Sequence, residues 1–119
     1  MREIHVSKIT DTVAHLCIEA CYNLGDDVKA LLQKAMQWET SPHGKNILGQ
    51  LLKNLSIAHE LQLPICQDTG MAVVFLEIGQ DVHIVGGDLY EAVHEGVRRG
   101  YAKGYLRKSV VSDPLLRQN

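Results

Sequence analysis

The apolar residues in the first half of the chain recur every three or four positions, as they do on one face of a helix. This pattern predicts a helix over residues 7–23, which Gly25 ends, and a second helix from Asp26 to about residue 39. A carboxylate at the start of the second helix favours the positive end of its dipole. A third helix is predicted over residues 42–61, with Ser41 as its N-cap. The N-terminal half is therefore predicted to be all-α.

The period changes in the second half of the chain. Residues 72–78 form an apolar run that is rich in β-branched side chains and too short for a helix, so they predict a buried strand. After a short turn, residues 82–85 predict a second strand, antiparallel to the first. A further helix is predicted over residues 89–102 with Asp88 as its N-cap, and residues 109–111 are a candidate third strand.

These elements predict an α+β fold: a helical N-terminal half packed on a small, mainly antiparallel sheet, with a further C-terminal helix. In the C-terminal helix we expect the larger apolar side chains to form the buried stripe, namely Leu89, Val93, Val97 and Tyr101. The chain has 119 residues, which predicts a single domain over residues 1–119.

Composition narrows the class of protein. The chain is 45% hydrophobic and 22% charged, with a net charge of -2, which is ordinary for a globular protein and gives no basic stripe for nucleic acid. No apolar stretch approaches the roughly 20 residues of a membrane helix, and no signal-peptide pattern opens the sequence. Three cysteines, an odd number, predict a reducing compartment, with the cytoplasm as the default.

Three groups of residues are weaker candidates for sites. Cys17 and Cys21 are spaced to share a metal ion on one helix face, although packing in the core explains Cys17 as well. Residues 86–88 precede a helix and either offer amides to an anion or simply turn the chain. A basic patch near the C-terminus is either a solvated helix face or a site for small anions, and it comprises Arg98, Arg99, Lys103, Arg107 and Lys108.

Residues 64–70 group several different functional side chains in one short stretch. A thiol (Cys66), an amide (Gln67), a carboxylate (Asp68) and a hydroxyl (Thr69) follow one another between a proline and a glycine. One interpretation is structural, with a buried thiol and Asp68 capping a turn. The others are functional: a nucleophilic cysteine, or a metal or cluster ligand beside a proton-transfer group. The nucleophile needs a histidine within reach, and the loop itself contains none.

This loop, with the apolar run after it and the segment 106–115 (LRKSVVSDPL), resembles the α-subunit or N-terminal region of class I fumarases. These are iron–sulfur hydro-lyases, and they include the L(+)-tartrate dehydratases. The resemblance covers the whole chain. It implies reversible dehydration of a 2-hydroxy dicarboxylate, with malate to fumarate as the first expectation and tartrate to oxaloacetate as the other.

The resemblance also implies an iron–sulfur cofactor. Cys66 matches one of three family cysteines that hold a [4Fe–4S] cluster, and Cys17 and Cys21 match neither of the others. The family's α part continues beyond the position of Asn119, where the two remaining ligands are expected. We therefore expect the chain to be the N-terminal portion of a longer subunit, and to be inactive alone.

The remaining site residues follow from the same motifs. Gln67 and Asp68 match residues that contact the dicarboxylate substrate, with Asp68 as the catalytic candidate, and Arg107 matches an arginine that binds a substrate carboxylate. The implied partners are the rest of the α-subunit and a β-subunit or β-domain, in a homo-oligomer that binds neither nucleic acid nor membrane. The alternative is a non-catalytic interaction or scaffold domain that retains the Cys66 loop.

Overall fold

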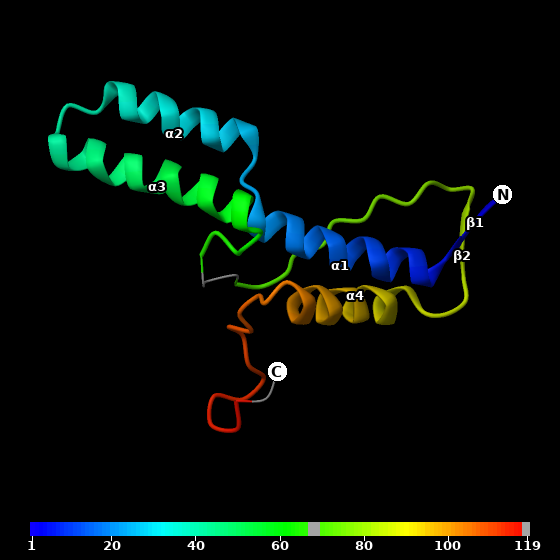
Figure 1. Cartoon of the computed structure of the whole chain (residues 1–119). Coiled ribbons are helices and arrows are strands. Elements are labelled where there is room, and N and C mark those ends of the chain that lie inside the picture. The colour runs from blue at the N-terminus through cyan, green and yellow to red at the C-terminus, as the bar shows by residue number, and fades with distance from the viewer. Residues whose placement is uncertain (67–69, 118–119) are drawn as a thin grey trace.

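Four helices and two short strands make up the part of the chain that the computed structural model describes, residues 1–66 and 70–117 (Figure 1). Among these residues, no helix combines the length and apolarity needed to cross a membrane. The predicted α+β class is thus confirmed. In chain order the elements are β1 (Arg2–His5), α1 (Val6–Tyr22), α2 (Asp26–Trp38), α3 (Pro42–Leu61), β2 (Val82–Val85) and α4 (Leu89–Lys103).

The predicted helices are confirmed to within one or two residues at each end, because local chemistry defines their starts. The Ser41 hydroxyl accepts a hydrogen bond from the Gly44 amide at 3.4 Å at the start of α3. The Asp88 carboxylate accepts one from the Glu91 amide at 3.0 Å at the start of α4. At α1 the cap is a histidine, His5, whose ring nitrogen Nδ1 accepts the amide hydrogen bond of the residue two positions later.

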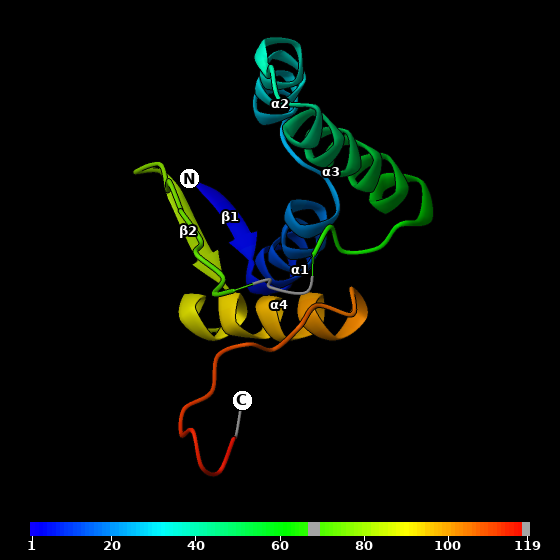
Figure 2. The same ribbon diagram turned by 90° about the vertical axis from the view of Figure 1, so that its left-hand side faces the viewer.

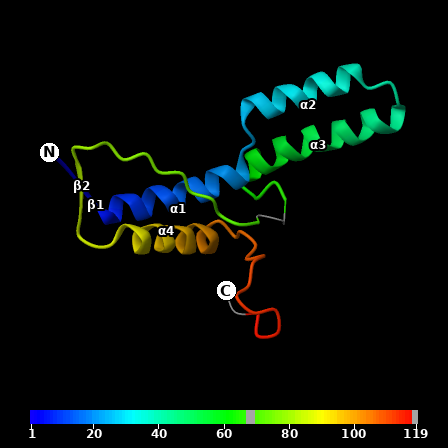
Figure 3. The same cartoon turned by 180° about the vertical axis from the view of Figure 1, so that it is seen from behind.

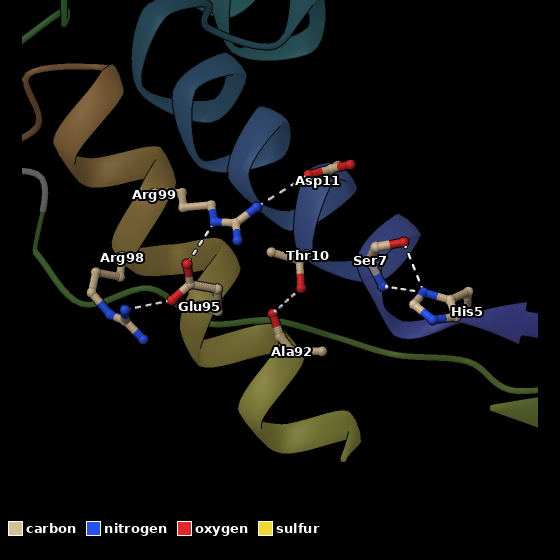
Figure 4. Close-up of polar contacts among 8 residues, drawn as sticks. All are labelled: His5, Ser7, Thr10, Asp11, Ala92, Glu95, Arg98 and Arg99. Atoms are coloured by element: carbon tan, nitrogen blue, oxygen red, sulfur yellow. Dashed lines mark hydrogen bonds and ion pairs between the residues drawn. The ribbon is translucent and has the colours of Figure 1, made fainter. Parts of the chain in front are cut away.

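α1 and α4 lie side by side and run in the same general direction (Figures 1 and 3). The contact is close because α4 presents small buried residues, Ala92, Gly96 and Gly100, toward α1. Val13 of α1 is buried against them. Thr10, also buried, donates a hydrogen bond from its hydroxyl to the carbonyl of Ala92 at 3.0 Å (Figure 4). This pair of helices forms the core.

The predicted apolar stripe of α4 is only half-buried. Small side chains occupy the α1–α4 contact, and the larger ones flank it, because two helix axes approach closely only where Cβ atoms are small or absent. A hydrophobicity pattern gives weight to large apolar residues and little to glycine. The pattern therefore predicts the helix correctly and its contact face wrongly. The predicted stripe is only half-buried, and it comprises Leu89, Val93, Val97 and Tyr101.

β1 and β2 pair in parallel, with Arg2 opposite Val82 and His5 opposite Val85 (Figure 2). The prediction of an antiparallel sheet is therefore wrong, and so is that of an all-α N-terminal half. Each strand leads directly into a helix, β1 into α1 and β2 into α4. Because those two helices run in the same direction, the strands before them do too. A parallel pair needs a long connection, and residues 6–81 supply it.

The predicted buried strand over residues 72–78 is also wrong. This segment forms no strand, and its large side chains are exposed, with Phe75 92% and Val73 70% accessible. A strand needs a hydrogen-bonded neighbour, and β2 pairs with β1 instead. The segment runs along α1 (Figure 3), and the candidate third strand at residues 109–111 is likewise irregular.

α2 and α3 form a helical hairpin that projects away from the α1–α4 core (Figure 1). α2 buries none of its residues, and α3 buries Ala58 alone. Leu31 and Trp38 of α2 are 61% and 75% exposed. The hairpin is relevant to the site because the Cys66 loop follows α3 in the chain.

Replacing Thr10 by valine should lower the free energy of unfolding by about 1 kcal/mol, because the change keeps the side-chain volume and removes the buried hydrogen bond to Ala92. Urea unfolding followed by circular dichroism measures the effect. Thr12→Val is the matched control, since Thr12 is exposed on the same helix. Equal stabilities of the two variants would show that the Thr10 hydrogen bond contributes nothing.

Candidate active site at the end of the α1–α4 pair

The backbone that leads to Cys66 is held between α1 and α3. α3 ends at Gln62, which adopts a left-handed conformation with φ 52 and turns the chain back. Ile65 then donates its amide to the carbonyl of Cys21 at 2.9 Å, and its own carbonyl accepts the Asn54 side-chain amide at 2.8 Å. Cys66 follows directly and is exposed. The helices thus fix the entry to the loop and leave its thiol accessible.

Gln67, Asp68 and Thr69 lie outside the described residues, so their roles remain predictions from the motif. The described chain resumes at Gly70, which has φ 60, a left-handed conformation that glycine adopts without a Cβ penalty. No atom of the described residues lies within 4 Å of the position of a Cβ at Gly70, so among them the backbone conformation rather than crowding favours glycine.

The segment that carries Arg107 is anchored at the C-terminal end of α4. The Tyr22 hydroxyl of α1, which is buried, donates to the carbonyl of Gly104 at 2.9 Å. Leu106 is 5% exposed, and its amide donates to the carbonyl of Tyr101 at 3.0 Å. Arg107 comes next and is exposed. A buried residue therefore fixes the backbone immediately before the arginine.

The structure brings Cys66 and Arg107 to the same end of the α1–α4 pair. The last turn of α1 contacts both segments: Cys21 binds the backbone of Ile65, and Tyr22 binds Gly104. Figures 1 and 3 both show the loop after α3 and the chain leaving α4 near this end of α1. Two motifs about 40 residues apart in the sequence thus lie near the same end of α1.

The three thiols are grouped here as well. Burial raises the pKa of Cys17, and the neighbouring Cys21 raises it further. Burial likewise raises the pKa of Cys21, with a further contribution from the thiol of Cys66. Across residues 1–66 and 70–117, no three histidine, cysteine or acidic side chains lie close enough together to hold a metal ion. The described residues alone therefore make no complete metal site, and Cys66 is the exposed thiol among the three.

A groove of about 960 Å³ lies beside these residues, between α1, the ends of α2 and α3, and the apolar segment that begins at Met71. One wall is polar. Asn23 donates from its side-chain amide to the carboxylate of Glu19 at 2.8 Å. Its side-chain oxygen lies 2.6 Å from Nδ1 of His59 and accepts a hydrogen bond from the ring when Nδ1 carries a proton. His59 could not be assigned to this site from the sequence, because it joins Asn23 across 36 positions of the chain.

Residues 10–119 match the family model described as "Fumarate hydratase (Fumerase)", a span that includes both the Cys66 loop and the Arg107 segment. The chain belongs to this fumarate hydratase family. The predicted family resemblance is thus confirmed.

Proteins similar to this chain include two that are named as α-subunits. The chain is 41% identical over 113 residues to "Putative L(+)-tartrate dehydratase subunit alpha" of Methanocaldococcus jannaschii, covering 94% of this chain and 39% of that protein. It is 31% identical over 106 residues to "L(+)-tartrate dehydratase subunit alpha" of Escherichia coli K12, covering 89% of this chain and 35% of that protein. The chain therefore spans less than two fifths of the length of either relative.

In this fumarase-family chain, the basic patch is partly neutralised by local ion pairs on α4. Arg99 donates from Nε to the Glu95 carboxylate at 2.6 Å and lies 3.6 Å from a carboxylate oxygen of Asp11 on α1 (Figure 4). Arg98 also pairs with Glu95. The hydrogen bond from Arg99 holds the pKa of Glu95 below its usual value. These contacts favour a solvated helix face for this part of the patch.

The turn at residues 86–88 has a structural explanation. Gly86 has φ 88, and a Cβ at this position would overlap the ring of His5, the residue that caps α1. Glycine is therefore needed both for the backbone conformation and for the close approach of β2 to the start of α1. The plain strand-to-helix turn accounts for this motif.

Proposed function

We propose that this chain is part of a class I, iron–sulfur hydro-lyase that reversibly dehydrates a 2-hydroxy dicarboxylate. One observation carries the proposal: the family match over residues 10–119 includes two separate motifs, and the fold brings them to the same end of the α1–α4 pair. The family description suggests malate as the substrate, and the names of the relatives suggest tartrate. Both are 2-hydroxy dicarboxylates, so one site chemistry serves either.

In this proposal Cys66 is one of three thiolate ligands of a [4Fe–4S] cluster, and the other two come from residues outside this chain. Its exposure at the end of an anchored segment suits a ligand that must meet groups from elsewhere. When bound, such a cluster leaves one iron open as a Lewis acid for the substrate hydroxyl.

The chain's own polar residues bind the substrate and move its proton. Dehydration requires removal of a proton from the carbon adjacent to the one that carries the hydroxyl, and the carboxylate of Asp68 takes it. The amide of Gln67 hydrogen-bonds the substrate beside it. Arg107 binds a substrate carboxylate through two parallel N–H···O bonds, which fixes the molecule in one orientation. The buried Leu106 limits the movement of that arginine's backbone.

The proposal includes partners. Relatives named as α-subunits support assembly with the rest of an α-subunit and with a β-subunit or β-domain, in a homo-oligomer. Exposed apolar residues of the segment 71–78 support the same view, since Met71, Phe75 and Leu76 are 73%, 92% and 52% accessible. The odd number of cysteines supports a reducing compartment, the cytoplasm.

Replacing Cys66 by alanine tests the proposed function. The complete α-subunit that contains this chain is reconstituted with its β-partner, iron and sulfide under anaerobic conditions, and then assayed with malate and with L(+)-tartrate. The unchanged enzyme should show iron–sulfur absorbance and dehydrate at least one substrate. Cys66→Ala should lose both properties, because two thiolates do not retain the cluster.

Cys17→Ala is the matched control and should keep cluster and turnover. The 119-residue chain alone, with one ligand of three, should stay colourless. Retention of cluster and activity in Cys66→Ala would refute the ligand assignment. If the reconstituted protein dehydrated neither substrate, the proposed hydro-lyase activity would be refuted. The alternative of a non-catalytic scaffold domain would then be favoured.

A further inference from the structure

Cys21 and Cys66 are neighbours in space although 45 positions separate them. The amide of Ile65 donates to the carbonyl of Cys21 at 2.9 Å, which joins the last turn of α1 to the residue just before Cys66. Consecutive Cα atoms are ~3.8 Å apart, so Cys66 lies one residue step from this bond. This hydrogen bond therefore places Cys66 beside the last turn of α1, where Cys21 lies.

The position of this contact is fixed by a second hydrogen bond. The side-chain amide of Asn54 on α3 donates to the carbonyl of Ile65 at 2.8 Å, so both polar groups of the Ile65 backbone are bound to helices. Both thiols are reachable from solvent, since Cys66 is exposed and Cys21 lines the 960 Å³ groove. A small oxidant can therefore reach a pair of thiols that the fold holds in proximity.

We propose that Cys21 and Cys66 are a redox pair, which forms a reversible intramolecular disulfide when Cys66 holds no iron. With a small-molecule disulfide as oxidant, the Cys66 thiolate attacks one sulfur of the oxidant and releases one thiolate. Cys21 then attacks the Cys66 sulfur of this mixed disulfide and releases the second thiolate. The two protein thiols are oxidised, the oxidant is reduced to two thiols, and the two thiol protons pass to those leaving groups.

Cys17 is the wrong partner for either thiol. It precedes Cys21 by one helical turn on α1, and residues at this spacing have Cβ atoms about 5–6 Å apart, whereas a disulfide needs about 3.5–4.5 Å. A Cys17–Cys21 bond would therefore distort α1. No backbone hydrogen bond between α1 and the Cys66 loop involves Cys17 in the described part of the chain. Specificity for Cys21 is the feature that the experiment must detect.

The disulfide would block Cys66 as a ligand and would protect its sulfur from irreversible oxidation. This consequence rests on the proposed function, in which Cys66 holds the cluster. Formation of the bond does not, because it needs neither iron nor substrate. Failure of the cross-link would leave the hydro-lyase standing, and a failed cluster reconstitution would leave the redox pair standing.

The test uses the purified, fully reduced 119-residue chain, which is incubated with oxidised glutathione under anaerobic conditions and then alkylated. A glutamate-specific protease separates the three thiols, since Cys17, Cys21 and Cys66 fall in residues 4–19, 20–39 and 61–77. Mass spectrometry should find residues 20–39 linked to 61–77, two of the three thiols lost to alkylation, and complete reversal by dithiothreitol.

Variants make the result specific. Cys17→Ser should form the same link. Cys21→Ser should lose it and instead accumulate the glutathione adduct on Cys66, with helix content checked by circular dichroism. Asn54→Ala, which keeps all three thiols and removes the side-chain hydrogen bond to Ile65, should slow cross-linking several-fold. A link to Cys17, links only between chains, or a stable Cys66–glutathione adduct in the unchanged protein would each overturn the proposal.

Discussion

Replacing both Gly96 and Gly100 by alanine should lower the free energy of unfolding by about 2–6 kcal/mol, since overpacking costs roughly 1–3 kcal/mol per site. A Cβ at Gly96 would lie 2.8 Å from the carbonyl oxygen of Thr10 and 2.7 Å from Cβ of Val13. One at Gly100 would lie 2.8 Å from the carbonyl oxygen of Ala14. Backbone atoms cannot rotate away as a side chain does, so α1 and α4 would have to separate.

The higher helix propensity of alanine opposes this destabilisation. Alanine is a better helix former than glycine by about 1 kcal/mol, so the same substitution stabilises a helix where space is open. Gly49 of α3 supplies that control, because the nearest atom to its added Cβ is the terminal carbon of Met36 at 4.0 Å. Urea unfolding should therefore show opposite signs, with Gly49→Ala stabilising and the double variant destabilising. A double variant as stable as Gly49→Ala would contradict the close contact of α1 with α4.

The helices could be predicted because their signals are local. Ser41 and Asp88 cap the helices for which their side-chain chemistry suits them, and the apolar period ends where the helices end. The sheet could not be predicted, because strand pairing depends on distant partners. β2 pairs with residues 2–5, and the more apolar segment at 72–78 pairs with nothing among the described residues. Hydrophobic content alone did not indicate which segment finds a neighbour.

Some residues of the candidate site could likewise be predicted from the sequence, and others could not. Cys66 could be selected because its loop groups several polar functional side chains, and Arg107 because its segment resembles the family's. The last turn of α1 contacts the backbone of both segments, which accounts for their common location. Cys21 and His59 could not be assigned to the same region from the sequence. Their positions depend on the Ile65–Cys21 hydrogen bond and on the contact of α3 with the end of α1, both of which are tertiary. Motifs identify reactive groups, and the fold identifies their neighbours.

Replacing Asp68 by asparagine in the reconstituted enzyme should lower kcat by about 10²–10⁴-fold, the usual contribution of a positioned general base. Asparagine keeps the size and hydrogen-bonding reach of the side chain, but its amide does not accept a proton near neutral pH. Under the proposed function the cluster is held by thiolates alone, so its absorbance should not change. Initial rates of dehydration, together with the visible spectrum, measure the two effects separately.

Asp81→Asn is the matched control for this loss of turnover. Asp81 is exposed, and its carbonyl binds the Arg2 amide at 2.9 Å beside β1, at the opposite end of α1 from Cys21. The control should retain full turnover. If Asp68→Asn also stayed within a few-fold of the unchanged enzyme, the base would have to be another group, and Asp68 would be left with a binding role. If the cluster spectrum were lost along with activity, Asp68 would be supporting the metal centre rather than transferring the substrate's proton.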